Sequence, residues 1–302
     1  MPFLQLTLSI GSADPEPFED ALLAAGASSI TLEDAEDNPV LEPAPGTTPL
    51  WPRVTLKALF DSDVSREAIL DTLRVDLPLP LPDASFETIE DRVWEREWLK
   101  DFKPMRFGRR LWICPGGQLP PSESRLTNHE SLPTCIVSLD PGLAFGTGTH
   151  PTTALCLEWL DNQDLRGKRV IDYGCGSGVL AIAALKLGAR EVFAVDIDPQ
   201  AIQATRDNAQ RNGVSGQLRV GMVEELAEFQ AEVLLANILA EPLKLLAGRF
   251  ADLVEPAGKI VLSGVLGLQA SEVANCYTPW FDIAPAAFHD DWARIDGVRR
   301  TI

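Results

Sequence analysis

One segment of the 302-residue chain constrains the fold more than any other: a short apolar strand that runs directly into a glycine-rich turn. Residues 170–178 read VIDYGCGSG, with glycines at alternate positions of the turn. Because glycine lacks a Cβ, the backbone of such a turn can approach a ligand closely. Ligands bind at the carboxyl ends of strands in open α/β sheets. The segment therefore predicts a strand, a ligand-binding turn and a helix within an α/β domain.

A second apolar stretch, residues 192–196 (VFAVD), ends in Asp196, which lies 20 residues after Gly176. A carboxylate at this distance can accept hydrogen bonds from ribose hydroxyls. A nicotinamide fingerprint counted from Gly174 would need a third glycine at position 179, where valine stands. This argues against a nicotinamide oxidoreductase, which binding of NADH would reveal. We interpret Asp172 and Asp196 as carboxylates that face a ligand rather than as helix caps.

From residue 150 onward the chain alternates between strand and helix patterns, which predicts a doubly wound, mainly parallel sheet. The predicted elements are a helix from Pro151, strands at 169–173, 191–195, 233–236 and 259–262, and helices at 179–187, 199–212 and 242–253.

The first ninety residues have the order β-α-β-β-α-β, which is typical of the split-βαβ or ferredoxin-like arrangement. Alternating apolar residues predict strands at 4–10, at 30–32, at 54–60 and around Phe86, and helical spacing predicts helices over 18–25 and 65–73. An acidic, proline-rich loop is expected over 33–52. A helix is expected over 89–102, with Trp94, Trp98 and Phe102 along one face, and loops with short strands over 103–140.

The composition excludes several classes of protein. Lys and Arg number 26 against 44 Asp and Glu, a net charge of −18, whereas a dedicated nucleic-acid binder needs a basic face. No Lys or Arg precedes Arg53, and no apolar run approaches the ~20 residues that span a bilayer. Five cysteines without a CxxC pair indicate a reduced, cytoplasmic protein, and three scattered histidines show no metal-ligand spacing.

Two further motifs narrow the assignment: GTGTHPTT at 146–153 and ANILAEPL at 236–243. Together with DYGCGSG at 172–178 and VDIDPQAI at 195–202, they resemble the seven-strand class I methyltransferases that use S-adenosylmethionine. Their order and spacing are similar to those of the bacterial ribosomal protein L-eleven methyltransferase family, which modifies large-subunit protein eleven. The N-terminal part matches this family by pattern rather than by motif.

The resemblance implies an α/β protein that transfers methyl groups from S-adenosylmethionine to lysine side chains and the α-amine of that ribosomal protein. It implies a substrate-recognition domain of ferredoxin-like fold over 1–89, a linker helix over 90–105 and a class I methyltransferase domain over 106–302. The substrate, free or on the ribosome, is the expected partner. We expect a cytoplasmic monomer with no metal, membrane or direct nucleic-acid partner.

The same resemblance implies the site residues. The cofactor contacts fall on Phe145, Gly146, Thr147, Thr153, Gly174, Gly176, Asp196 and Asn237. The catalytic residue is Asn237, whose side chain would accept a hydrogen bond from the incoming amine. Related amine methyltransferases follow this Asn with two prolines and an aromatic residue, whereas Ile238 and Leu239 follow it here.

Several interpretations stay open at this point. His150 could touch the substrate or act as a base, or it could cap a helix and pack. Phe145 could wall the methyl-transfer pocket or only pack. Cys175 is expected to be a small residue in a tight turn, not a nucleophile. The acidic N-terminal surface could recruit a basic partner or only confer solubility. A methyltransferase acting on another protein or a small amine is the nearest alternative, and a non-enzymatic scaffold is a more distant one.

Overall fold

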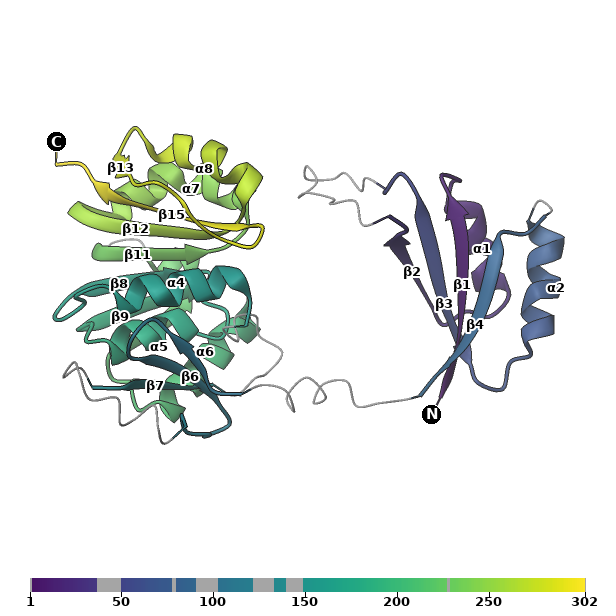
Figure 1. The fold of residues 1–302 in the computed structure, drawn as a ribbon, viewed down its shortest axis with the longest axis horizontal. Helices are drawn as coiled ribbons and strands as arrows, with labels where there is room; N and C mark the ends of the chain where they lie inside the picture. The colour runs from purple at the N-terminus through teal and green to yellow at the C-terminus, as the bar shows by residue number, and fades with distance from the viewer. Residues whose placement is uncertain are drawn as a thin grey trace. The chain divides into compact units, whose positions relative to one another are not determined.

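A computed structural model describes residues 2–36, 50–77, 80–90, 103–121, 133–139, 149–226 and 229–301. The chain divides into two compact units, Met1–Trp94 and Glu95–Ile302. Figure 1 shows the elements of both units.

The described residues of the N-terminal unit form two helices and one four-stranded sheet. Its elements are β1 (Phe3–Gly11), α1 (Glu16–Ala24), β2 (Ser29–Asp34), β3 (Val54–Asp61), α2 (Arg66–Asp76) and β4 (Asp83–Ile89). The strands pair antiparallel in the order β2-β3-β1-β4, so the two central strands are the first and third along the chain.

The apolar alternation of the sequence builds this unit's core. Along β1 the apolar side chains Leu4, Leu6 and Leu8 are buried, while the polar residues between them are partly exposed. Helices α1 and α2 cover the apolar face of the sheet (Figure 1), and they contribute Leu22 and Leu73 to the core. The strand and helix predictions for residues 4–73 are therefore confirmed.

Two boundaries differ from the predictions. Glu33 and Asp34 belong to β2, so the acidic loop begins later than residue 33, and residues 37–49 of it lie outside the described residues. Ile89 ends strand β4 and is not helical, because it pairs with Phe3 of β1. The rest of the predicted helix over 89–102, with its aromatic residues, lies outside the described residues apart from Glu90.

The C-terminal unit holds a three-stranded sheet and the large sheet. The first comprises β5 (Met105–Phe107), β6 (Leu111–Pro115) and β7 (Cys135–Leu139). The strands of the large sheet are β8 (Arg169–Tyr173), β9 (Glu191–Asp196), β10 (Leu218–Met222), β11 (Ala231–Asn237), β12 (Val254–Leu266), β13 (Phe281–Ile283), β14 (Ala287–His289) and β15 (Trp292–Arg299). The helices are α4 (Pro151–Asp161), α5 (Val179–Lys186), α6 (Pro199–Arg211), α7 (Ala240–Leu253) and α8 (Ala270–Tyr277), with short 3₁₀ turns η3 (Val223–Leu226) and η4 (Gly267–Gln269).

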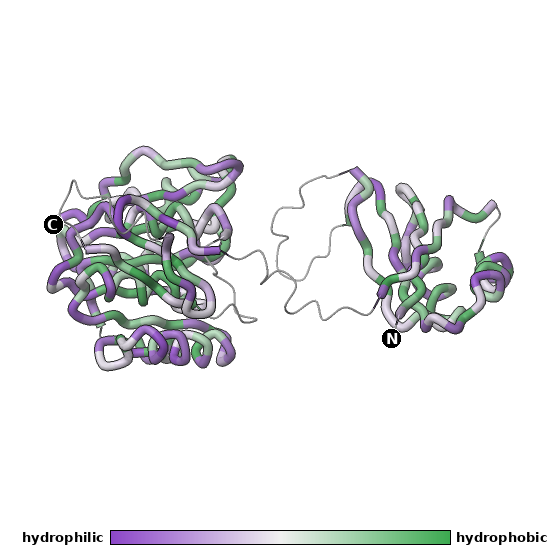
Figure 2. The backbone as a smooth tube through the Cα atoms, turned by 60° about the horizontal axis from the view of Figure 1, so that its bottom comes forward, coloured by the Kyte–Doolittle hydropathy of each residue, from purple (hydrophilic) through white to green (hydrophobic). Residues whose placement is uncertain are grey.

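The large sheet is doubly wound. Its strand order is β10-β9-β8-β11-β12-β15-β13, with β14 paired to β15. The first five strands are parallel, and β15 runs antiparallel to β12. Helices α4, α5 and α6 cover one face and α7 and α8 the other, each over its own apolar cluster (Figure 1). Figure 2 shows that the hydrophobic stretches follow the central strands, as expected when both faces of a parallel sheet are buried.

The predicted mixed α/β architecture is confirmed, and the predicted strand at 169–173 matches β8 residue for residue. Strand β12 is longer than predicted because Pro256 and Gly258 lie within it instead of ending it. Strands β10, β13, β14 and β15 and helix α8 were not predicted. No helix among the described residues is long and apolar enough to cross a membrane.

Candidate active site

Three predicted site residues meet at one edge of the large sheet. Gly174 follows β8, Asp196 ends β9 and Asn237 ends β11. These strands are parallel neighbours in the order β9-β8-β11, so their carboxyl ends share one edge. After β8 the chain forms β9 on one side of this strand, and later it forms β11 on the other side. This is the topological switch point at which open α/β sheets bind ligands.

The turn after β8 needs its glycines. Gly174, Gly176 and Gly178 all have positive φ angles, of 79°, 54° and 78°. A Cβ on Gly174 would overlap the side chain of Ile238, and one on Gly178 would lie 2.8 Å from the Thr205 methyl group. The turn therefore keeps its shape only because these positions have no side chain.

Side chains of α6 hold the same turn in place. The hydroxyl of Thr205 donates to the carbonyl oxygen of Gly176 at 3.0 Å, and the Asn208 amide donates to that of Ser177 at 2.9 Å. Cys175 is buried, and burial raises the pKa of its thiol. The thiol contacts Thr205 Oγ1 at 3.3 Å. A neutral buried thiol fits the predicted role of a small turn residue and not that of a nucleophile.

Asp196 closes the turn from the neighbouring strand. Its Oδ2 accepts from the backbone N–H of Gly176 at 2.9 Å, and its Oδ1 accepts from that of Asp198 at 3.1 Å. A carboxylate has about four acceptor sites, so these two bonds leave capacity for ligand hydroxyls. The side chain is partly exposed at the edge of the sheet. The following residue, Ile197, is 80% exposed, an apolar side chain beside the same edge that sequence reasoning did not identify.

The sequence predicts that the Asp172 carboxylate faces a ligand, but the structure gives this side chain a different environment. The side chain is buried, and its Oδ2 accepts from the N–H of Ala181 in the first turn of α5 at 2.9 Å. This half of the carboxyl group caps a helix, because the first N–H groups of a helix have no partner within it. The other oxygen, Oδ1, is buried and has no hydrogen-bond partner among the described residues. Burial raises the pKa of Asp172 to about 7, and the nearby Asp196 carboxylate adds to the shift.

This raised pKa predicts a pH dependence of stability. In the unfolded chain Asp172 titrates near pH 3.9, so between about pH 4 and pH 7 the folded protein retains a proton that the unfolded chain has released. Asp172 therefore stabilises the fold fully below about pH 4, and this contribution is lost as the pH rises toward 7. We expect denaturant unfolding to show Asp172→Asn gaining stability relative to the unsubstituted protein between pH 5 and 8, on the order of 2 kcal/mol. Equal pH dependences for both proteins would contradict the raised pKa.

Asn237 and Thr153 form the second part of the site. The Asn237 Nδ2 donates to the hydroxyl oxygen of Thr153 at 3.2 Å, which joins the end of β11 to the first turn of α4. Thr153 is 1% exposed. The Asn237 Oδ1 is buried and has no partner among the described residues. The described residues therefore fix one end of this amide and provide no donor for its acceptor oxygen.

Two glycines, Gly174 and Gly264, lie close to Ile238, the residue that follows Asn237. Gly264 in β12 has a φ angle of 83° and lies where the pairing of β12 with β15 shifts register. A Cβ there would lie 2.8 Å from the carbonyl carbon of Ile238 and 3.0 Å from its nitrogen. Gly174 faces the side chain of Ile238. Sequence reasoning identified Gly174 but missed Gly264, although its place directly after the apolar run 260–262 and Ser263 was a usable signal.

His150 has a capping and packing environment. Its Nδ1 lies 2.8 Å from the hydroxyl of Thr152 and accepts from the Thr152 N–H at 3.4 Å, so it caps α4. Its ring packs edge-on against Trp292 with centroids 4.7 Å apart, and burial lowers its pKa. Of the two interpretations left open by the sequence, the structure supports the cap. The predicted contacts Phe145, Gly146 and Thr147 lie outside the described residues.

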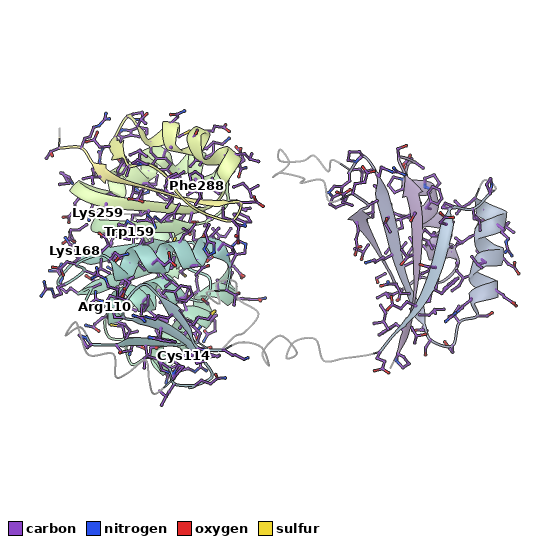
Figure 3. The ribbon with its side chains drawn as sticks, viewed as in Figure 1. Arg110, Cys114, Trp159, Lys168, Lys259 and Phe288 are labelled. Carbon is purple, nitrogen blue, oxygen red and sulfur yellow. The ribbon has the colours of Figure 1, made fainter. Side chains whose placement is uncertain are left out.

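A cavity of about 230 Å³ lies at the opposite, amino edge of the sheet. Its lining includes Lys168, just before β8, and Lys259, which is in register with the early residue Val233 of β11. Figure 3 labels both lysines at this end of the unit. None of the predicted site residues lines this cavity, so it does not belong to the candidate active site.

Comparisons with known proteins agree on one family. The family model described as "Ribosomal protein L11 methyltransferase (PrmA)" matches residues 2–300. Proteins named ribosomal protein L11 methyltransferase from Pseudomonas putida (strain GB-1) and Pseudomonas aeruginosa (strain LESB58) are 52% and 51% identical over 301 residues. These alignments span 99% of this chain and 100% and 99% of those proteins. The crystal structure of a ribosomal protein L11 methylase from Lactobacillus delbrueckii subsp. bulgaricus is 30% identical, with a TM-score of 0.58. It covers 66% of this chain and 100% of that one.

Proposed function

The chain belongs to the ribosomal protein L11 methyltransferase (PrmA) family, and from this premise we propose that it methylates ribosomal protein L11. The methyl groups come from S-adenosylmethionine. The acceptors are lysine side chains and the α-amine of the substrate. The predicted family resemblance is confirmed by the family model and by full-length relatives above 50% identity.

One observation supports the catalytic assignment: the buried Oδ1 of Asn237 has no donor among the described residues, although the other end of the amide is fixed by Thr153. A buried acceptor without a partner costs about 1–3 kcal/mol, so it suits a donor that arrives with the substrate. A neutral amine supplies such an N–H. When the Asn237 oxygen accepts that N–H, the lone pair of the nitrogen is oriented for attack. We propose this as the role of Asn237.

The residues present also fit the cofactor. The glycine turn offers close backbone access, and Asp196 retains acceptor capacity for hydroxyl groups. The buried Oδ1 of Asp172 is a second acceptor without a donor among the described residues, and it suits a cationic group nearby. Thr153, Gly174, Gly176, Asp196 and Asn237 would hold S-adenosylmethionine, which supplies an electrophilic methyl group on a sulfonium when bound. Phe145, Gly146 and Thr147 remain proposed contacts.

The acceptor amine must be neutral to react. For a lysine of pKa about 10.4, deprotonation at pH 7 costs roughly 4.6 kcal/mol, whereas an α-amine of pKa about 7.7–8.0 costs only about 1 kcal/mol. Removal of the amine from water lowers its pKa and offsets part of the cost for lysine. The apolar surroundings at the end of β11, including Ile238 and Ala240, provide this environment. The displaced proton passes to solvent before transfer. Positioning the two reactants supplies the remaining rate enhancement.

We further propose that residues 1–89 form a ferredoxin-like substrate-recognition domain, residues 90–105 a linker and residues 106–302 the class I methyltransferase domain. The strand order β2-β3-β1-β4 with two helices on one face supports the first assignment. Residues 1–100 carry 20 acidic and 7 basic side chains, a charge that favours a basic partner. A monomer acting in the cytoplasm fits this substrate.

Substitution of Asp196 tests the cofactor assignment. We expect Asp196→Ala to weaken binding of S-adenosylmethionine about 10- to 100-fold, because a hydrogen bond to a charged group contributes roughly 1.5–3 kcal/mol. Asp196→Asn keeps one acceptor oxygen and should lose less affinity. Isothermal titration calorimetry measures both constants. Unchanged affinity in Asp196→Ala would remove this residue from the cofactor site.

Intact-mass analysis tests the proposed function as a whole. Ribosomal proteins from cells that lack the enzyme would be incubated with the full chain and S-adenosylmethionine. Mass increases in methyl steps on ribosomal protein L11 alone would support both the reaction and the substrate. Methyl steps on a different protein would keep the reaction and replace the substrate. Confirmed cofactor binding with no transfer to any protein would favour a small amine as acceptor.

A further inference from the structure

A short hairpin extends past the carboxyl edge of the large sheet. Strands β14 and β15 pair antiparallel, with His289 opposite Trp292, and Asp290 and Asp291 form the turn between them. Asp290 has a φ angle of 51°. The backbone oxygen of Asp291 accepts from the N–H of Gly267 at 2.7 Å. The turn is therefore tied to η4 at the end of β12.

The strand register places this turn beyond the proposed reacting position. Asn237 pairs in register with Ser263 of β12, and Leu266, three residues further along β12, pairs with Trp292. Three residues correspond to about 10 Å along a strand. Trp292 also packs against His150, the cap of the helix that carries Thr153. The hairpin turn thus lies at the same carboxyl edge of the sheet as the Asn237–Thr153 pair, beyond the ends of the strands.

The surface beside the turn combines apolar and acidic groups. Phe288 is 61% exposed and Leu268 is 70% exposed, and the Phe288 ring lies against Gly267 in η4. Asp290 and Asp291 are exposed, and neither side chain forms a hydrogen bond or ion pair within the described parts of the chain. We call Leu268, Phe288, Asp290 and Asp291 the hairpin surface. Figure 3 labels Phe288, away from the end of the unit that holds Lys168 and Lys259.

We infer that the hairpin surface is the docking site for the lysine-bearing segment of the acceptor protein, an inference that rests on the proposed function. The two carboxylates attract the ammonium group of an approaching lysine. The apolar side chains accept the methylene stem of a lysine or the apolar residues beside it. The two carboxylates lie more than about 10 Å of strand length beyond the register position of Asn237, so they raise the rate of encounter while their effect on the amine at the reacting position is largely screened.

Charge favours this occupant over the alternatives. A second copy of this chain carries a net charge of −18 and would bring like charges together at the hairpin. An anionic membrane surface would be repelled in the same way. A cationic, lysine-containing segment has the complementary sign, and the proposed reaction requires such a segment to reach this edge of the sheet.

The test compares two double variants of the full chain that change the net charge equally. Asp290→Asn/Asp291→Asn removes the carboxylates of the hairpin surface, and asparagine tolerates the left-handed backbone of position 290. Asp207→Asn/Asp252→Asn removes two exposed carboxylates from helices α6 and α7. With unmethylated ribosomal protein L11, we expect the first variant to raise KM for the acceptor about 5-fold at low salt, with kcat and cofactor affinity unchanged. The second variant should leave KM within about 2-fold, and about 0.5 M salt should remove the difference.

Other outcomes distinguish a failure of docking at the hairpin surface from a failure of the proposed function. An unchanged KM in an active Asp290→Asn/Asp291→Asn variant, or equal changes in both double variants, would overturn docking at the hairpin surface and leave the proposed function intact. Phe288→Ser gives a charge-independent check and should also raise KM without altering kcat. No transfer to ribosomal protein L11 by the unsubstituted chain would overturn the proposed function, and this inference with it.

Discussion

Asn237→Ala will lower the turnover of methyl transfer about 100-fold, on the scale observed when one hydrogen-bonding group of a reaction site is removed. The reason is the geometry of the amide: its Nδ2 is held by Thr153, while its buried Oδ1 has no donor in the part of the chain that the structure describes and is available to the proposed substrate amine. The lost oxygen acts mainly on the acceptor amine, so turnover should fall by a larger factor than the affinity for S-adenosylmethionine, to which Asn237 also contributes. Single-turnover rates and cofactor titration measure the two effects separately.

Thr153 provides a matched control for this prediction. Thr153→Ser keeps the hydroxyl that accepts from Asn237, whereas Thr153→Val replaces it with a methyl group of similar volume. Turnover should stay near normal in the first variant and fall in the second, because the amide is then free to rotate. A large loss of cofactor affinity with normal turnover in Asn237→Ala would show that Asn237 binds the cofactor and does not orient the amine.

Gly264→Ala is expected to reduce both the stability and the activity of the protein. A non-glycine residue at a φ angle of 83° is strained, and its Cβ would lie 2.8 Å from the carbonyl carbon of Ile238. We expect the free energy of unfolding to fall by about 2–4 kcal/mol. Ile238 must move to relieve the contact, so turnover should fall as well in protein that remains folded. Denaturant unfolding and single-turnover kinetics at a temperature below the transition measure these effects.

Gly216→Ala is the matched control. A Cβ at Gly216 meets nothing within 4 Å, and its φ angle is not positive. The substitution should leave turnover unchanged and alter the free energy of unfolding by less than about 1 kcal/mol. If Gly264→Ala behaved like Gly216→Ala, the backbone of Ile238 would not depend on the glycine in β12.

Local patterns in the sequence predicted most of the elements that surround the site. Strand β8 and its glycine turn were recognisable because an apolar run, alternate glycines and an apolar helix follow one another without interruption. Strand β12 was predicted too short because Pro256 and Gly258 usually end a strand. Here the strand begins at Val254, which pairs with Ala231 of β11, and it ends at Leu266, which pairs with Trp292 of β15. Pairing partners far apart in the sequence decide such boundaries, and a local pattern does not contain them.

The sequence predicted where the site lies in the fold but not the role of every residue in it. The carboxyl ends of the strands bring Gly174, Asp196 and Asn237 to one edge, as the α/β alternation indicates. The sequence favoured a ligand-facing Asp172 over a helix cap, but one of its oxygens caps α5, a contact that depends on the packing of strand against helix. The sequence did not reveal Gly264, which approaches Ile238 from a strand that joins the sheet later in the chain. Contacts between elements distant in sequence account for both differences.

The position of β15 affects the order in which the newly synthesised chain can fold. This strand is the last in chain order, yet it lies between β12 and β13, and its first residue packs against His150 at the cap of α4. During synthesis, β8 to β13 therefore leave the ribosome before β15, the strand that completes their sheet, has been made. Until residues through Arg299 emerge, β12 has an unpaired edge and α4 lacks its aromatic neighbour. The order of folding in this unit cannot follow the order of synthesis, and an incomplete nascent chain would expose a strand edge open to mispairing.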